Sequence, residues 1–176
     1  MARFRVPPMS RALVLTTTLA FLVPGSFLLC AALWKVPLGG LGFALLVLYA
    51  AVWLWFRPLR YEVTDAKLEI VFPLRTRTIR LRDVRSADAL PGALARNRLG
   101  FVVRVGVGGL FGVFGRLWTS RAGWLDAYIT RLDKFVWLDR QHPHRSLILS
   151  VDDPDGFVQQ LEGRIQASLP RSKAEP

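Results

Sequence analysis

Two long uncharged runs dominate the first third of the chain. The first extends from Ala12 to Trp34 and the second from Val36 to Phe56. A helix of about 20 apolar residues crosses the roughly 30 Å of hydrocarbon in a bilayer. Neither run has the polar stripe that a surface helix of a soluble domain shows. The pattern therefore predicts transmembrane helices over residues 12–34 and 36–56, joined by an external turn over residues 35–40.

The charges that flank these runs indicate their orientation. Three arginines precede the first run and two follow the second, whereas the turn contains only Lys35. The flanking arginines are Arg3, Arg5, Arg11, Arg57 and Arg60. Because cytoplasmic loops are enriched in Lys and Arg, both termini are expected in the cytoplasm, with residues 1–11 as a cytoplasmic N-terminal tail. A cleavable signal peptide is the alternative for the first run, but its length and the second run that follows favour a hairpin.

A few residues inside the runs bear on helix packing. Pro24 removes one backbone hydrogen bond and predicts a kink. Gly40 and Ala44 lie four residues apart, a spacing that lets helices approach closely, within the hairpin or in a dimer. Cys30 is the only cysteine, which excludes an intramolecular disulfide, and it is expected to act as a small apolar residue.

After residue 56 the pattern changes to short alternating segments separated by turn residues, which is typical of strands. Residues 60–64 and 67–72 predict a hairpin. Residues 74–81 predict a third strand, with a bulge where the alternation slips between Thr78 and Ile79. Further strands are predicted over residues 110–118, 124–130, 135–138 and 146–151.

The chain closes with a predicted amphipathic helix. Pro154 suits the first helical position, and the aspartates before it can cap the helix. Apolar residues then recur at helical spacing: Phe157, Leu161 and Ile165. Residues 57–169 are therefore expected to form one cytoplasmic domain, and residues 170–176 a disordered tail.

About seven short strands followed by one C-terminal helix is the element order of a pleckstrin-homology (PH) fold. The chain resembles bacterial PH-like proteins, in which two membrane spans precede such a domain. The resemblance rests on residues 61–64, 79–84, 106–115 and 150–157. It implies a membrane α-helical hairpin plus a mainly-β PH-like domain, a curled sheet or barrel capped by the C-terminal amphipathic helix. It also implies a multi-pass protein of the bacterial inner membrane that acts as an interaction module and has no known catalytic residues.

Positive charge is concentrated directly after the second run. The formal net charge is +11, and residues 57–121 contain 13 basic and 5 acidic side chains. The densest cluster consists of Arg75, Arg77, Arg80, Arg82 and Arg85. Anionic lipid attracts each nearby Lys or Arg by about 1 kcal/mol, so this cluster is a candidate lipid or partner contact. A strand face in contact with solvent is the alternative.

The glycine-rich stretch from Gly106 to Gly115 has no charge and is too short to span a bilayer. Its glycine spacing fits neither a dinucleotide fingerprint nor a P-loop. Two interpretations remain: a buried strand that curls the sheet, which we favour, or a loop that dips into the membrane interface. In the second case Phe111 and Phe114 contact lipid, and replacing both by Asp weakens that contact without unfolding.

No catalytic or cofactor constellation is recognisable. His142 and His144 are the only histidines, and a surface turn around Pro143 is favoured over a metal site. No nucleic-acid-binding motif is present. The sequence thus predicts a non-enzymatic, cofactor-free module that binds a protein partner or the anionic inner leaflet. The alternative is an accessory subunit of a membrane transporter or enzyme, acting mainly through its hairpin.

Overall fold

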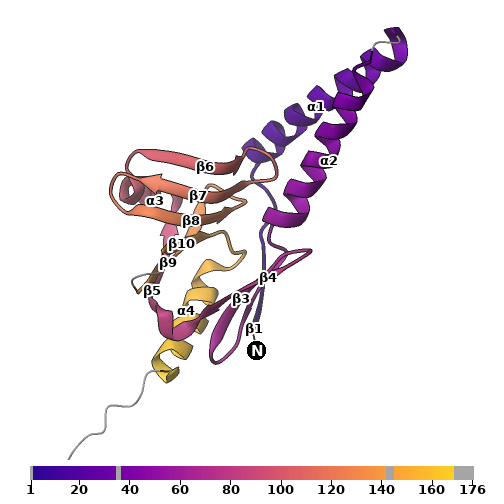
Figure 1. Cartoon of the computed structure of the whole chain (residues 1–176). Coiled ribbons are helices and arrows are strands. Elements are labelled where there is room, and N and C mark those ends of the chain that lie inside the picture. The colour runs from indigo at the N-terminus through magenta and orange to yellow at the C-terminus, as the bar shows by residue number, and fades with distance from the viewer. Residues whose placement is uncertain (1, 35–36, 142–144, 169–176) are drawn as a thin grey trace, which may run out of the picture.

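The computed structural model describes residues 2–34, 37–141 and 145–168, and Figure 1 shows a helical hairpin that projects from a β-rich domain. The turn around His142, Pro143 and His144 and the tail over residues 170–176 lie outside the described residues.

The hairpin consists of α1 (Arg11–Trp34) and α2 (Gly39–Phe56). Both helices are long and apolar enough to cross a membrane, and most of their side chains are exposed, which suggests membrane association. The close approach of the two helices occurs at Gly42, where a Cβ atom would collide with Leu28 and with the backbone of Pro24. A Cβ atom at Gly40 would meet nothing, so Gly42 takes the packing role that was expected of Gly40.

The segment before α1 is part of the fold. Residues Ala2–Arg5 form β1, which pairs antiparallel with β2 (Arg60–Val63) directly after α2. A simple tail was expected here, because four residues before a membrane span give little strand signal. The pairing places the chain before α1 and the chain after α2 on the same side of the hairpin (Figure 1).

The first sheet has the order β1-β2-β3-β4, with β3 at Lys67–Val71 and β4 at Thr76–Arg80. The predicted hairpin of β2 and β3 is confirmed. The predicted bulge between Thr78 and Ile79 is wrong, since β3 and β4 pair in unbroken register from Lys67 opposite Arg80 to Val71 opposite Thr76. The alternation therefore keeps its phase, which matters for the arginines of β4.

The second sheet has six strands in the order β5-β9-β10-β8-β7-β6. Their bounds are Val84–Pro91 for β5, Val102–Gly108 for β6, Val113–Thr119 for β7, Gly123–Ile129 for β8, Lys134–Arg140 for β9 and Ser146–Leu149 for β10. Strands β8 and β10 are parallel, and the other pairs are antiparallel. The single strand predicted over residues 110–118 is wrong at its start, because residues 109–112 form the turn between β6 and β7.

Two short helical elements connect the sheets and strands. A 3₁₀ turn over Leu81–Asp83 leads into β5, and α3 (Gly92–Leu99) lies between β5 and β6. Leu99 packs in a small cluster on one face of the second sheet together with Leu117, Leu125 and Trp137.

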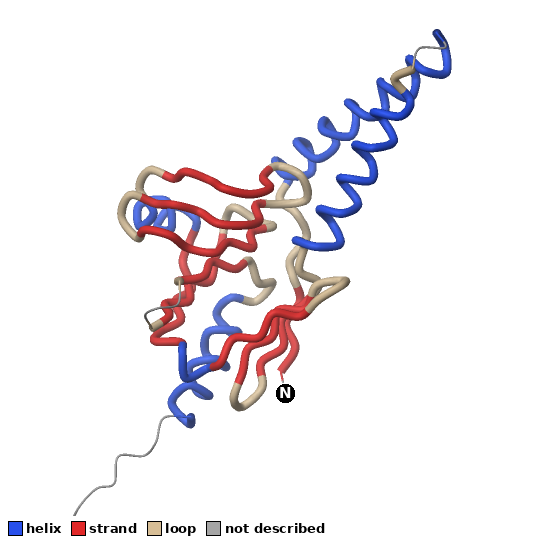
Figure 2. Tube along the Cα trace, viewed as in Figure 1, coloured by secondary structure: helices blue, strands red, loops and turns tan. Residues whose placement is uncertain are grey.

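The predicted C-terminal helix is confirmed as α4 (Pro154–Ser168). It lies between the two sheets (Figures 1 and 2) and buries Phe157, Leu161 and Ile165 in the main core. That core also takes Ile79 from the first sheet and Leu138 from the second. Two sheets of four and six strands with a C-terminal helix agree with the expected PH-like fold, although the strands outnumber the seven expected.

The domain is fastened to the base of α1. The Thr17 hydroxyl donates to the Gly109 carbonyl oxygen at 2.9 Å and accepts the Phe111 N–H at 3.0 Å. The Phe111 ring packs edge-on against Phe21 of α1 with centroids 6.0 Å apart. Phe111 holds a positive φ of 61°, unusual for a residue with a side chain, and these contacts hold that conformation. The hairpin and the domain thus share a hydrogen-bonded junction.

Candidate anion-binding cleft

The core-facing side of β4 has an apolar residue near its C-terminal end and a basic residue nearer its start. Ile79 is 1% exposed, and because side chains alternate along a strand, Arg77 lies on the same face two positions away. Arg75 follows at the same spacing, immediately before the strand. Two arginines thus extend from the core side of the first sheet.

The second sheet continues this charged layer. On three of its strands a charged residue lies two positions from a buried core residue: Arg116 from Phe114 on β7, Asp126 from Tyr128 on β8, and Arg140 from Leu138 on β9. The two sheets therefore enclose an apolar core that gives way to a layer of charge at one end.

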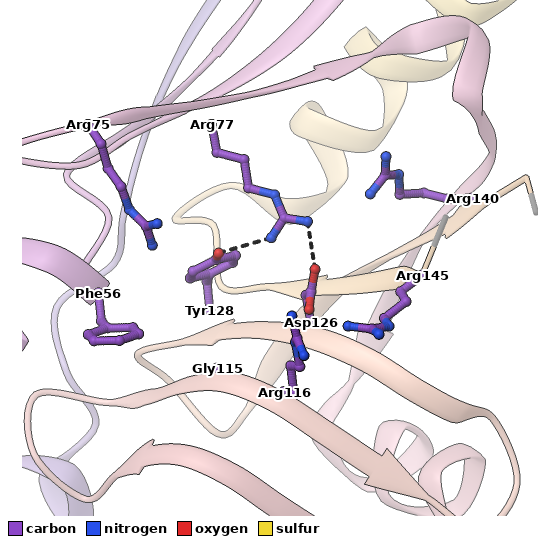
Figure 3. A pocket seen from close by; sticks show the side chains of 9 residues that line it. All are labelled: Phe56, Arg75, Arg77, Gly115, Arg116, Asp126, Tyr128, Arg140 and Arg145. Carbon is purple, nitrogen blue, oxygen red and sulfur yellow. Dashed lines mark hydrogen bonds and ion pairs between the residues drawn. The ribbon is translucent and has the colours of Figure 1, made fainter. Parts of the chain in front are cut away.

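This charged layer lines a cleft of about 540 Å³ between the sheets, which we call the basic cleft. Figure 3 shows the arginine side chains from both sheets converging on Asp126 and Tyr128. The lining residues are Phe56, Arg75, Arg77, Gly115, Arg116, Asp126, Tyr128, Arg140 and Arg145. Among these residues five are arginines and one is an acid, so the cleft is strongly positive.

Arg77 spans the cleft from one sheet to the other. Its guanidinium donates to the Asp126 carboxylate at 2.6 Å and to the Tyr128 hydroxyl at 3.0 Å (Figure 3). Burial lowers the pKa of Arg77, but Tyr128 and Asp126 more than offset this, so the pKa lies above its ordinary value. The pair leaves the Arg77 side chain 32% exposed, which keeps part of its guanidinium open to the cleft.

Arg140 is the arginine with an unmet hydrogen bond. Its Nε is buried and has no partner among the described residues. The pKa of Arg140 lies below its ordinary value, first because of burial and second because of the positive charge of Arg77. A buried donor without an acceptor costs roughly 1–3 kcal/mol, so an acceptor oxygen entering the cleft would stabilise this side chain.

The end of the cleft nearest the hairpin is aromatic. Phe56, the last residue of α2, lines it. The Arg75 guanidinium lies 4.7 Å from the ring centroid of Phe72 and 6.0 Å from that of Trp55 on α2. Such stacking orients a guanidinium while leaving its edge free to donate. The cleft therefore extends to the point where α2 meets the domain.

The five arginines singled out in the sequence do not form one surface. Arg75 and Arg77 line the basic cleft. Arg80 and Arg82 are exposed and border a separate depression beside Lys67. Arg85 is exposed at the start of β5. The strand parity that turns Arg77 inward turns Arg80 outward.

The two phenylalanines of the glycine-rich stretch also separate. Phe114 is fully buried in the main core, which corrects its expected lipid contact, because a buried ring cannot reach a membrane without unfolding. Phe111 is partly buried at the junction with α1. The favoured interpretation, burial of this stretch, holds for Phe114, whereas Phe111 lies at the junction with α1.

Sequence reasoning missed Arg116, Asp126, Arg140 and Arg145, which lie far from the β4 cluster in the chain. A usable signal exists in three of them: each continues the alternation of a core-facing strand position with a charge. Arg145 lies in the connection before β10 and gives no such signal.

The chemistry of the cleft suits binding. Guanidinium groups donate to phosphate and carboxylate oxygens in bidentate pairs. The described residues contain no group of three or more His, Cys, Asp or Glu side chains placed to hold a metal ion. The arrangement offers donors for an anion.

Comparison with known proteins agrees with the fold. Residues 59–165 match the family of bacterial PH domains, more than half of the chain. No curated protein and no solved structure matches the chain. PH-like domains are typically non-catalytic, and the match indicates a binding module of some kind. With two apolar helices before a domain of this architecture, the chain belongs to the bacterial PH domain family.

Proposed function

We propose that the chain is a membrane-anchored, non-enzymatic binding module whose basic cleft holds the phosphate headgroup of an anionic phospholipid of the cytoplasmic leaflet. The observation that carries the proposal is the position of the cleft: five arginines line it, and it extends to Phe56 at the end of α2.

The orientation of the hairpin supports this location. Arginines flank its base on both sides, and the only basic residue of its distal turn is Lys35. Because basic residues are retained in the cytoplasm, the domain lies on the cytoplasmic side of the bacterial inner membrane. Headgroups of the same leaflet then lie level with the last turn of α2, where Arg75 stacks near Trp55.

The donors of the cleft fit a phosphate group. Phosphate oxygens accept several charge-assisted hydrogen bonds at once, and Arg77, Arg140 and Arg145 supply donors from three parts of the fold. An oxygen near the buried Nε of Arg140 satisfies that donor, and its negative charge screens Arg140 from Arg77. A cleft of about 540 Å³ accommodates a headgroup.

The test uses the full chain in nanodiscs of zwitterionic lipid doped with anionic phospholipid. Lipids that remain bound are identified by native mass spectrometry after release. The wild-type chain is expected to retain anionic phospholipid selectively. The double variant Arg77→Gln/Arg140→Gln is expected to retain at least about tenfold less, since the loss of even one charge-assisted bond costs roughly 1.5–3 kcal/mol.

The matched control is Arg80→Gln/Arg82→Gln, which removes two positive charges from the neighbouring exposed surface. It is expected to keep the selectivity of the wild type. If both double variants lose lipid equally, attraction is by net charge alone and the cleft is not the site. A further arm adds inorganic phosphate to nanodiscs without anionic lipid. Saturable binding of phosphate there, without selective lipid retention, would replace the lipid by a free anion.

The variant Arg77→Lys/Arg140→Lys checks for unfolding. It keeps both charges and loses the bidentate geometry. Its lipid retention is expected to lie between the wild type and the glutamine variant, with a thermal unfolding midpoint close to that of the wild type.

A further inference from the structure

One edge of the second sheet is free. Strand β6 ends the order β5-β9-β10-β8-β7-β6, and among the described residues only β7 pairs with it. Proteins usually protect such an edge with charges, prolines or a short strand, because it is a template for another strand. Here the edge is seven residues long, contains four valines and has Arg104 as its only charged residue.

The parity of the ladder shows which backbone groups the edge offers. The Ser120 N–H donates to the Phe101 carbonyl at 3.0 Å, so Phe101 takes a bonded position opposite Ser120. Bonded positions alternate in an antiparallel pair, and the register continues through Val103 opposite Trp118. The N–H and C=O groups of Val102, Arg104 and Gly106 therefore point away from β7.

An exposed apolar row adjoins this edge. Val103 of β6 lies opposite Trp118 of β7, which lies opposite Trp124 of β8. The three side chains are 42%, 37% and 46% exposed, and Val105, the next residue of β6 on the same face, is 55% exposed. A tryptophan pair beside an open strand edge is the composition of a protein interface.

The row lies at the end of the strands farther from the membrane helices. The turn at Gly109 contacts Thr17 of α1, whereas Trp118 and Trp124 lie at the opposite ends of β7 and β8. Figure 1 shows these strand ends pointing away from the hairpin. A protein segment suits this position better than lipid.

We propose that the free edge of β6, together with Val103, Trp118 and Trp124, docks an extended acidic segment of a partner protein, which adds a strand to the second sheet. The charge of the occupant follows from its surroundings. Arg104 lies on the edge strand, on the opposite face from Val103 and the tryptophan row. Side chains of an added strand alternate, so its apolar residues contact the tryptophan row on one face and its acidic residues meet Arg104 on the other.

A second copy of this chain is a poor occupant of the same edge. Antiparallel pairing of two β6 edges centred on Arg104 would bring the Arg104 side chains of the two copies together, and like charges in contact oppose association. The total charge of +11 acts in the same direction. The complementary partner is acidic.

The test measures binding of two fluorescent peptides to the full chain in nanodiscs of zwitterionic lipid. One peptide alternates valine with glutamate, and the other alternates valine with lysine. The glutamate peptide is expected to bind saturably and at least about tenfold more tightly than the lysine peptide. Equal binding of the two peptides would overturn the proposal.

Variants at Arg104 distinguish the contribution of backbone hydrogen bonds to peptide binding from that of the Arg104 charge. Arg104→Pro removes a backbone N–H that points away from β7, so the ladder between β6 and β7 stays intact. Arg104→Gln removes the same charge and keeps the N–H. Arg104→Pro is expected to weaken the glutamate peptide about tenfold more than Arg104→Gln does, and Trp118→Ser to weaken it also. Equal effects of Arg104→Pro and Arg104→Gln would contradict strand addition.

Two further measurements test whether the peptide binds elsewhere or a second copy of the chain occupies the β6 edge. The cleft variant Arg77→Gln/Arg140→Gln is expected to bind the glutamate peptide like the wild type, and loss of binding would show that the peptide occupies the basic cleft. Sedimentation in detergent is expected to give one chain per particle. A dimer that Arg104→Pro dissociates would make a second copy the occupant and overturn the proposal.

Discussion

Asp126 offsets part of the positive charge of the basic cleft. Among the residues that line the cleft it is the only acid, and it forms its ion pair with Arg77 at 2.6 Å. The Asp126 side chain is 13% exposed, so solvent screens this pair only partly. The carboxylate orients Arg77 but also repels any anion that enters.

Replacing Asp126 by Asn tests this balance. Asp126→Asn removes the repulsion and keeps the side-chain shape, so the affinity for anionic phospholipid is expected to rise about fivefold, equivalent to about 1 kcal/mol. Titration of anionic lipid into nanodiscs containing the full chain measures the change. A fall in affinity would mean that orienting Arg77 matters more than the charge of the cleft.

Phe114 provides a prediction about stability. Its ring is fully buried in the main core, and Phe→Ala changes in cores cost roughly 3–5 kcal/mol. Phe114→Ala is expected to lower the free energy of unfolding in detergent by that amount. Trp118→Ala, a change at a 37% exposed ring on the same strand, is the control and is expected to cost much less. Equal losses would contradict the core position of Phe114.

The sequence predicted which residues face the core wherever apolar residues recur at regular spacing. The β2–β3 hairpin and the apolar face of α4 were predicted because Tyr61, Ile70 and Phe157 lie at regular core positions. On β4 the same rule failed. Arg75 and Arg77 occupy core-facing positions, so the alternation looked interrupted and a bulge was inferred. A pattern of polar and apolar residues therefore does not reveal the charged layer, because charged residues at core-facing positions look like solvent-facing ones.

At the scale of elements, the junction between α1 and the β6–β7 turn decides how the domain is held. Thr17 contributes a donor and an acceptor to that turn, and Thr16 donates to the same Gly109 carbonyl oxygen at 3.1 Å. The chain before α1 is tied in as well, since the Ser10 N–H donates to the Thr130 carbonyl oxygen at 3.1 Å. The hairpin and the domain are expected to move as one body.

Thr17→Val removes both side-chain hydrogen bonds of Thr17 with little change in shape. The two bonds together contribute about 2 kcal/mol, so amide exchange in the turn over residues 109–112 is expected to accelerate about thirtyfold in nanodiscs. Thr18→Val changes an exposed neighbour on the same helix and should leave exchange unaltered. Identical exchange in both variants would show that other contacts hold the turn.

The elements that the sequence missed share a physical reason. Strand β5 contains Arg85, Asp88 and Pro91, and β6 contains two glycines, so neither has the composition of a strand. The pairing of β5 comes from a distant partner, β9, whereas β6 pairs with β7 across the short turn over residues 109–112. Strand β1 forms for the same reason as β5, because β2 is brought to it by the hairpin. The long-range pairing of β1 and of β5 is not encoded in a local pattern.

At the scale of the whole molecule, the pairing of β1 with β2 closes the chain around the base of the hairpin. In the proposed orientation, with the domain in the cytoplasm, the turn between α1 and α2 faces the opposite side of the membrane. Gly40 is exposed near this turn, and Ala122 is exposed between β7 and β8.

Single cysteines test this topology. In a Cys30→Ser background, Gly40→Cys is expected to react with a membrane-impermeant maleimide once the outer membrane is permeable. Ala122→Cys is expected to react only after the inner membrane is disrupted. The reverse pattern would place the domain outside the cytoplasm and remove the basic cleft from the cytoplasmic leaflet.

The most direct test of headgroup binding is amide hydrogen exchange of the full chain in nanodiscs with and without anionic phospholipid. The account predicts slower exchange in β4 and at the Arg140 end of β9 when anionic lipid is present, and no such change in the Arg77→Gln/Arg140→Gln variant. If exchange in these strands does not change with anionic lipid, or slows equally in the variant, headgroup binding in the basic cleft is contradicted.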